Sequence, residues 1–358
     1  MNRGRYASPK PIDYFELCGV ARPKPLPDFD IAKARPRPYR PFRWPYHQTM
    51  GVMNMDPDYF IELESTYKSR VAQRLSIHRT QQTKVLNATP GAELACTELM
   101  EIVIQFLCVR YPNLFTFDHR TGAFYNGILQ REFDTRTMHP LRVLIENVPE
   151  DFLIMLYNEK TGFYHLRAGV AISAIGWNLG EKLDKSMPEI HVPVPDYKAK
   201  IENSVNRFFN KLTADKPIQR GSWGFEVGEQ LFLQTDSPHW AERLNQNPSL
   251  TPADIYLRVD WQTLRRLPRS KAIVFNFKAL FTPLTQLRTE PRIPRLLAMI
   301  LRHSQENIMK YKGTWHAEHV LIPAFESWAE EQEREIGVQE GGVRTLDEHP
   351  FYPGWNSK

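Results

Sequence analysis

Apolar residues recur at intervals of three and four along two early stretches of the chain, which is the spacing of helices with one buried face. The first predicted helix begins at Asp56–Pro57, where a capping residue precedes a proline that a first turn tolerates, and ends near His78. Its expected buried face consists of Phe60, Leu63, Tyr67, Val71 and Leu75. The second begins after residues 89–91 and ends near Arg110, with an expected buried face of Leu94, Leu99, Val103, Phe106 and Leu107.

The middle of the chain shows strand patterns instead. Residues 164–175 are apolar and rich in β-formers, and residues 222–235 alternate Trp223, Phe225 and Val227 around a Gly-Glu turn, as a hairpin would. Two more strands are expected at 254–261 and 271–281. An intervening helix, at 196–212, has a face of Ile201, Val205, Phe208, Phe209 and Leu212, and two helices follow at 292–311 and 317–336. This order predicts an α+β fold, a mostly antiparallel sheet with flanking helices in a single main domain.

The start of the chain is rich in proline: 9 of the 28 prolines lie within the first 45 residues. Proline lacks an amide donor and fixes φ, so we expect neither a helix nor a central strand there. Residues 1–48 are therefore predicted to form a basic extended arm, anchored on the body by Phe42, Trp44 and Tyr46. The main domain is expected at 49–336, followed by an irregular tail at 337–358.

Composition is that of a soluble globular protein, with 42% hydrophobic and 24% charged residues. The net charge of +5 is concentrated in residues 1–50, which hold 10 Lys and Arg against 4 Asp and Glu, whereas the rest of the chain holds 36 against 37. A solvated arm is favoured over one that binds nucleic acid or a membrane surface. Three scattered cysteines and no apolar run near 20 residues predict a cytoplasmic protein with no membrane span.

Motifs for several cofactors are missing from the sequence. There is no glycine-rich phosphate loop and no Gly-x-Ser-x-Gly elbow, and three scattered cysteines cannot supply four ligands to an iron–sulfur cluster. Electrons for any redox reaction must then come from another protein. His316 and His319 have the i, i+3 spacing of helix-borne metal ligands, but without a third ligand a surface pair is the favoured interpretation.

Two stretches are candidates for chemistry. In the segment 189–195, "EIHVPVP", His191 lies in a frame that Pro188, Pro193 and Pro195 restrict. That rigidity suits an axial metal or haem ligand, and equally a structural turn whose histidine bonds a carbonyl. Residues 256–277 gather Arg258, Arg265, Arg266 and Arg269 with Asp260 and Gln262. Such a cluster suits carboxylates or phosphates, although a charged strand edge has the same composition.

Several separated motifs resemble the haem-dependent oxidative N-demethylase alpha-subunit-like family. They are "GWNLGEKLDKSMPEIHVPVPDYKAKIENSVNRFFNKL", "IQRGSWGFEV", "LRVDWQTLRRLPRSKAIVFNFKAL" and "MKYKG", in that order between about residues 50 and 315. The resemblance implies a PAS-like fold that holds a b-type haem. It also implies a monooxygenase-type oxidoreductase that removes a methyl group from a small secondary amine such as dimethylamine. Dioxygen would be consumed, formaldehyde released, and electrons supplied by a separate flavin and iron–sulfur reductase.

The resemblance also assigns residues. His191, inside the Ile-His-x-Pro-Val-Pro motif, is implied as the axial haem ligand. The Arg-x-x-Trp motif falls on Arg220 and Trp223, and the Arg-rich motif falls on Arg258, Gln262, Arg265, Arg266 and Ser270. Arg258 or Arg266 would anchor propionates or steady the oxygen intermediate.

Three positions differ from the pattern that the resemblance leads us to expect. Ser222 stands where an Asn is expected, and Asp260 and Trp261 stand where Glu-Arg is expected. Asp260 is the first candidate for holding and deprotonating the amine, and Glu226 the second. A PAS-like haem or small-ligand sensor or binding protein without turnover is the alternative function.

Overall fold

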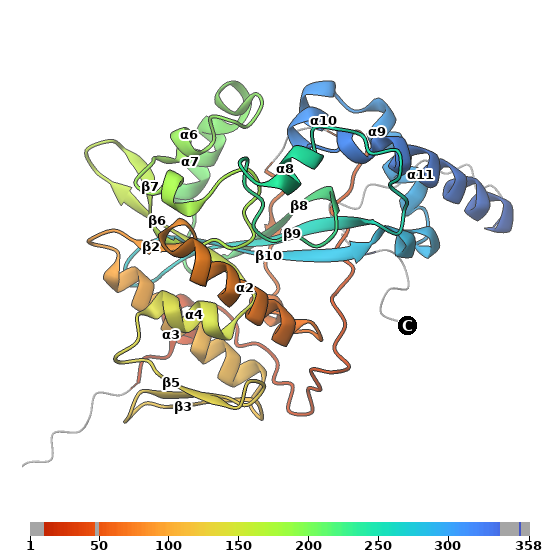
Figure 1. The fold of residues 1–358 in the computed structure, drawn as a ribbon. Helices are drawn as coiled ribbons and strands as arrows, with labels where there is room; N and C mark the ends of the chain where they lie inside the picture. Colours follow the sequence, from red (N-terminus) through yellow and green to blue (C-terminus); the bar gives the residue numbers. More distant parts are fainter. Residues whose placement is uncertain (1–10, 47–49, 337–350, 352–358) are drawn as a thin grey trace, which may run out of the picture.

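The computed structural model of the protein describes residues 11–46, 50–336 and 351, and its architecture is α+β, as the sequence pattern predicts (Figure 1). Seven strands form the main sheet in the order β1-β8-β9-β10-β6-β7-β2, and every neighbouring pair is antiparallel. The strands are β1 (Met53–Asn54), β2 (Leu86–Ala88), β6 (Asp151–Asn158), β7 (Phe163–Val170), β8 (Ile218–Val227), β9 (Ile255–Arg266) and β10 (Ile273–Pro283). A second sheet holds β3 (Phe115–Asp118), β4 (Ala123–Asn126) and β5 (Arg131–Asp134).

Helices cover the main sheet in three groups. On one side, α2 (Tyr67–Gln81), α3 (Glu93–Arg110) and α4 (Pro140–Asn147) lie between the main sheet and the small one (Figure 1). Toward one end of the long strands lie α5 (Leu179–Lys182), α6 (Met187–Ile190), a π-helical turn (Tyr197–Ile201) and α7 (Glu202–Lys211). Toward the other end lie α8 (Pro238–Glu242), α9 (Ile293–His303), α10 (Glu306–Lys312) and α11 (Trp315–Ile336). Each group buries its own hydrophobic cluster against the strands.

The helix expected from Asp56 begins later than predicted. Asp56 does cap a turn, but this is a short 3₁₀ helix, Pro57–Tyr59, and α2 begins only at Tyr67. The intervening backbone bonds to other parts of the chain: the Leu63 amide donates to the Tyr111 hydroxyl at 3.2 Å, and the Ser65 amide to the Ala34 carbonyl at 2.9 Å. Those long-range bonds replace the i to i−4 bonds of a helix.

The hairpin expected around residues 228–229 is also wrong. β8 ends at Val227, and its partner is β9, which follows after a connection that contains α8. The segment after the turn leaves the sheet, and Leu233 instead bridges Ile175, with its amide 3.0 Å from the Ala174 carbonyl. Leu94 was expected on the buried face of the second helix, but its side chain is 47% exposed on α3. The helix expected at 292–311 is divided at Ser304, which is extended (φ −74°, ψ 162°), into α9 and α10.

The described part of the arm packs on the body. Phe42 is fully buried in the cluster of α9, α11, β8 and β9, where its ring meets Trp223 edge to face at 5.2 Å between centroids. Contrary to expectation, the arm contains a short helix, α1 (Tyr14–Cys18), in a stretch free of proline. Asp13 caps its first turn, and Gly19 ends it in the left-handed region, at φ 73°.

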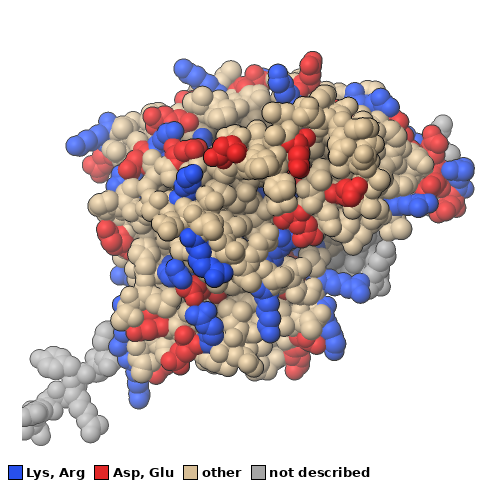
Figure 2. Space-filling view, viewed as in Figure 1, with Lys and Arg blue, Asp and Glu red and all other residues tan. Residues whose placement is uncertain are grey.

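The predicted tail, 337–358, lies outside the described residues apart from Phe351. None of the described helices combines the length and the apolar character needed to cross a bilayer. On the face drawn in Figure 2, acidic and basic side chains are intermingled rather than gathered by sign.

Candidate functional site

One face of the β8–β9 pair carries most of the residues that the sequence singled out. Side chains directly opposite each other in antiparallel strands project from the same face of the sheet. The register sets Arg220 opposite Gln262, Ser222 opposite Asp260, Gly224 opposite Arg258 and Glu226 opposite Tyr256. We call the face formed by Arg220, Ser222, Glu226, Arg258, Asp260 and Gln262 the polar face.

Trp223 and Arg265, both expected to contact a cofactor, project from the opposite face. Successive side chains of a strand alternate between the two faces of the sheet. Trp223 is three residues from Arg220, and Arg265 is five residues from Asp260, so each lies on the face opposite to its neighbour in the polar face. Trp223 packs in the core below Phe42, and the Arg265 guanidinium lies 4.4 Å from the centre of the Phe60 ring. The structure therefore does not bring them together with the polar face.

Arg266 projects from the same side of the sheet as the polar face, but its guanidinium already has hydrogen-bond partners within the protein. It donates to the Leu212 and Phe209 carbonyls, each at 2.6 Å, to the Lys271 carbonyl at 2.9 Å and to the Tyr164 hydroxyl at 2.9 Å. These bonds hold the end of α7 on the sheet, which leaves little capacity to bind a propionate. Ser270 is likewise in a turn, where its amide donates to Glu98 at 2.8 Å.

Arg258 and Asp260 form the centre of the polar face. Arg258 Nε donates to Asp260 Oδ1 at 2.9 Å, and Nη2 donates to the Ser173 carbonyl. Arg258 Nη1 is buried and has no hydrogen-bond partner among the described residues. Burial raises the pKa of Asp260, and the carboxylates of Asp151 and Glu226 add to this effect while Arg258 opposes it. Asp260 is therefore a carboxylate of raised basicity, and the neighbouring Arg258 has an N–H group that can still donate a hydrogen bond.

Glu226, the second candidate for the amine, is already paired. Arg243, which directly follows α8, forms an ion pair with Glu226 and also donates to the Gly313 carbonyl at 3.4 Å. Both side chains of the pair are largely buried, with 12% and 7% exposure. This pair ties α8 to β8 and to the end of α10. Glu226 is also less accessible than Asp260, whose side chain is 26% exposed.

The segment around His191 is built as a capped turn. Ser186 and Glu189 form a capping box at the start of α6, with the Ser186 amide 2.7 Å from Glu189 Oε2, and Pro188 lies in the first turn. His191 ends this helix, with φ −96° and ψ 5°. Its ring stacks on Tyr197, at 4.6 Å between centroids and 12° between planes. The imidazole is therefore held by local backbone and by an aromatic neighbour.

The hydrogen bond of His191 fixes its tautomer. Nδ1 lies 2.9 Å from the Met187 carbonyl oxygen, which can only accept, so Nδ1 carries the proton. Burial lowers the pKa of His191, and the charges of Arg220 and Lys182 lower it further against the effect of the Met187 bond. The ring is neutral near pH 7, and Nε2 keeps the lone pair that a metal ligand needs.

Arg220 links His191 to the polar face. Its positive charge acts on His191, and it also opposes the rise that burial produces in the pKa of Tyr311 on α10. Arg220 on β8 therefore lies near both α6 and α10. Asp260 keeps 26% of its side-chain surface accessible, more than Arg258 beside it, which keeps 5%.

Sequence reasoning missed Tyr197. Its side chain is 4% exposed, and its hydroxyl is buried without a hydrogen-bond partner among the described residues. The residue follows His191 by six positions across a turn, a spacing that no helical or strand period highlights.

The prediction that His316 and His319 form a surface pair is wrong. His316 is 2% exposed, and its Nδ1 lies 2.9 Å from the Gly313 carbonyl oxygen.

These observations fit a haem group with one axial imidazole. His191 offers a neutral ring whose Nε2 keeps its lone pair, and Arg258 Nη1 and the Tyr197 hydroxyl are buried donors without acceptors among the described residues. In residues 11–46, 50–336 and 351, no three or more His, Cys, Asp or Glu side chains are grouped so as to hold a metal ion. A single axial histidine would not form such a group.

Comparison with known families gives a match that covers residues 51–322 of the 358. The matched family is described as haem-dependent oxidative N-demethylase, alpha subunit-like. The match spans all seven strands of the main sheet, His191 and the polar face. The chain belongs to the haem-dependent oxidative N-demethylase alpha-subunit-like family.

Proposed function

We propose that this protein binds a b-type haem through His191 and oxidatively demethylates a small secondary amine of the dimethylamine kind. The observation that carries the proposal is the Nδ1 bond of His191 to the Met187 carbonyl, at 2.9 Å. Metal-binding histidines commonly donate their second ring nitrogen in this way, because the bond orients the ring and raises its basicity. Tyr197, stacked on the ring, restricts it further.

Two arginines are suited to the carboxylates of a haem. Arg220 lies near His191, and Arg258 has a buried Nη1 with no acceptor in the part of the chain that the structure describes. A guanidinium N–H that donates to a carboxylate forms a charge-assisted hydrogen bond, which is stronger than a neutral one. The haem would supply the activation of dioxygen and the oxidation of the N-methyl group, with release of formaldehyde.

Asp260 is proposed to bind the amine. A secondary ammonium ion carries two N–H donors, and Asp260 offers a carboxylate whose side chain is 26% accessible. Because burial raises its pKa, Asp260 accepts a proton more readily than an exposed aspartate does. Its role would be to hold the ammonium and take one proton, so that the neutral amine is presented for oxidation.

Electrons are proposed to come from a separate reductase that carries flavin and iron–sulfur groups. The three cysteines are free, Cys18 and Cys96 are buried, and burial raises the pKa of Cys96 and of Cys108 to about 12, so none is prepared to bind a cluster. Free thiols also support the proposal of a reducing, cytoplasmic compartment. The sheet with flanking helices is compatible with the PAS-like haem domain that the sequence suggested.

The first experiment compares absorption spectra of the full chain produced with haem supply. We expect a Soret band that His191→Ala abolishes or displaces, whereas His165→Ala, whose ring is bonded to Thr161 and the Asp184 carbonyl, leaves it unchanged. A band that is identical in His191→Ala and the unmodified protein would refute the assignment of His191.

The second experiment measures formaldehyde from dimethylamine and related amines with reductant and dioxygen. Asp260→Asn should keep the Soret band and lower turnover by about 10²–10⁴-fold. A fully haem-loaded protein that forms no formaldehyde from any amine would overturn the demethylase proposal and favour a sensor.

A further inference from the structure

A small hollow lies under α1, on the side of β9 opposite to the polar face. Its lining includes Tyr14, Phe15 and Cys18 of α1, Phe60, Phe106 of α3 and Arg265 of β9. The space accommodates about one particle the size of a water molecule. The walls are mostly aromatic and aliphatic, and Arg265 is the one charged residue among the described residues that line it.

Arg265 is largely buried, and part of its guanidinium is unpaired. It is 5% exposed, and its buried Nε has no hydrogen-bond partner among the described residues. The guanidinium carbon lies over the face of the Phe60 ring, 4.4 Å from the ring centre. A guanidinium that leaves water normally regains its hydrogen bonds inside the protein, because an unpaired buried charge is costly.

The carboxylate of Glu98 does not meet that requirement. Glu98 is fully buried and its charge acts on Arg265, but its two oxygens accept the amides of Arg269 at 2.6 Å and Ser270 at 2.8 Å. Cys18 is neutral, since burial raises the pKa of its thiol. The amide of Gln105 is also engaged, with Oε1 accepting the Tyr14 amide at 2.8 Å.

We propose that this hollow is a binding site for a small monovalent anion, chloride in size, held by Arg265. The guanidinium would provide the charge and the donors, and the apolar walls would disfavour strongly hydrated ions. The site lies on the far face of the sheet from His191, so it does not depend on the proposed demethylase activity.

Binding in this hollow would stabilise the docked arm. α1 closes the hollow and is attached by Tyr14, whose hydroxyl bonds to Glu101 and accepts from Arg269 at 3.2 Å, and by Gln105, which donates to the Ile12 carbonyl at 3.1 Å. An ion between Arg265 and α1 is lost when α1 moves away. Anion binding and arm docking are therefore coupled.

The test is thermal unfolding of the full chain in chloride, bromide or gluconate at constant ionic strength. We expect chloride and bromide to raise the unfolding midpoint saturably, by about 2 °C or more over gluconate. Arg265→Met should lose this response. Arg302→Met should keep it, because Arg302 is an exposed cation that pairs with Glu326 and does not line the hollow.

A crystal grown in bromide provides a measurement that needs no variant. An anomalous peak beside the Arg265 guanidinium would support the proposal. Equal halide responses in the unmodified protein and Arg265→Met, or water alone in the hollow at saturating bromide, would overturn it.

Discussion

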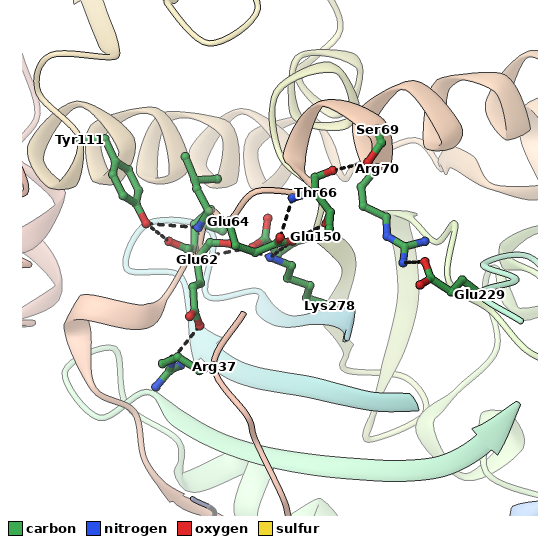
Figure 3. A network of polar contacts seen from close by, with 12 residues as sticks. Arg37, Glu62, Glu64, Thr66, Ser69, Arg70, Tyr111, Glu150, Glu229 and Lys278 are labelled. Carbon is green, nitrogen blue, oxygen red and sulfur yellow. Dashed lines mark hydrogen bonds and ion pairs between the residues drawn. The ribbon is translucent and has the colours of Figure 1, made fainter. Parts of the chain in front are cut away.

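Glu150 is a buried acid whose ionisation should control the pH dependence of folding. It is 2% exposed, its Oε1 accepts the Glu62 amide at 3.3 Å, and its Oε2 is buried without a partner among the described residues. Figure 3 shows it beside Glu64 and Lys278. Burial raises its pKa from 4.5 to about 7, although Lys278 and Arg74 oppose the rise.

The sign and size of the effect follow from that rise. Between pH 4.5 and 7 the unfolded chain loses the Glu150 proton while the folded protein keeps it, so the free energy of unfolding falls as the pH increases. Each unit of pKa corresponds to about 1.4 kcal/mol, which gives a loss of about 3 kcal/mol that is complete above pH 7. Below pH 4.5 both states hold the proton, and the contribution is constant.

Glu150→Gln removes this titration and keeps the acceptor for the Glu62 amide. The difference in free energy of unfolding, variant minus unmodified protein, should therefore increase by about 3 kcal/mol in favour of the variant between pH 4.5 and 8. Urea unfolding followed by tryptophan fluorescence at several pH values measures this difference. Other titrating groups cancel, because they are the same in both proteins.

Glu64→Gln is the matched control, since it should act with the opposite sign. Burial opposes the ionisation of Glu64, but Lys278 at 3.4 Å and the amide and hydroxyl of Thr66 hold its pKa below the usual value. Ionised Glu64 therefore stabilises the folded protein, so Glu64→Gln should lose stability relative to the unmodified protein as the pH rises toward 4.5 and show a level difference above it. A flat difference for Glu150→Gln from pH 4.5 to 8 would refute the reasoning.

Three further predictions concern packing and the His191 ring. Phe42→Ala should lower the free energy of unfolding by about 3–5 kcal/mol in urea titrations, because the ring is fully buried and its loss leaves a cavity. Gly221→Ala should undock the arm and increase protease cleavage there, since an added Cβ would lie 2.8 Å from Pro41 Cγ and closer still to the Tyr39 ring. Gly224→Ala, whose nearest neighbour is 3.8 Å away, should resist cleavage as the unmodified protein does. Tyr197→Leu should speed the transfer of haem to a scavenger protein while Tyr197→Phe, which keeps the stacked ring, should not; equal rates would show that stacking does not matter.

Local patterns predicted the elements that depend on local interactions. The second helix ends at Arg110 as expected, and β9 and β10 overlap the strands that apolar patterns predicted, although β9 continues to Arg266 rather than ending near residue 261. The wrong predictions concern segments whose backbone hydrogen bonds go to residues far away in the sequence. The Tyr111 hydroxyl takes the Leu63 amide out of a helix, and Leu233 pairs with Ile175 rather than with β8. No window of adjacent residues contains that information.

The candidate site was partly visible in the sequence. Alternation along β9 puts Arg258, Asp260 and Gln262 on one face, and the same parity separates Arg265 from them, so strand periodicity alone is enough to make that distinction. The engagement of Arg266 by four groups from other segments could not be anticipated. The Met187 carbonyl that fixes the tautomer of His191 is a property of the turn, not of residue types.

The buried position of Phe42 has a consequence for where this protein can be cut. Family similarity begins at residue 51, but Tyr39 and Phe42 belong to the same hydrophobic cluster as Trp223 and Trp261. A shortened protein that starts at the edge of the similarity would expose two indole rings and a strip of β8 and β9 to solvent, a surface prone to self-association. The cooperative folding unit is therefore longer than the segment that defines the family, and the proline-rich arm is part of it.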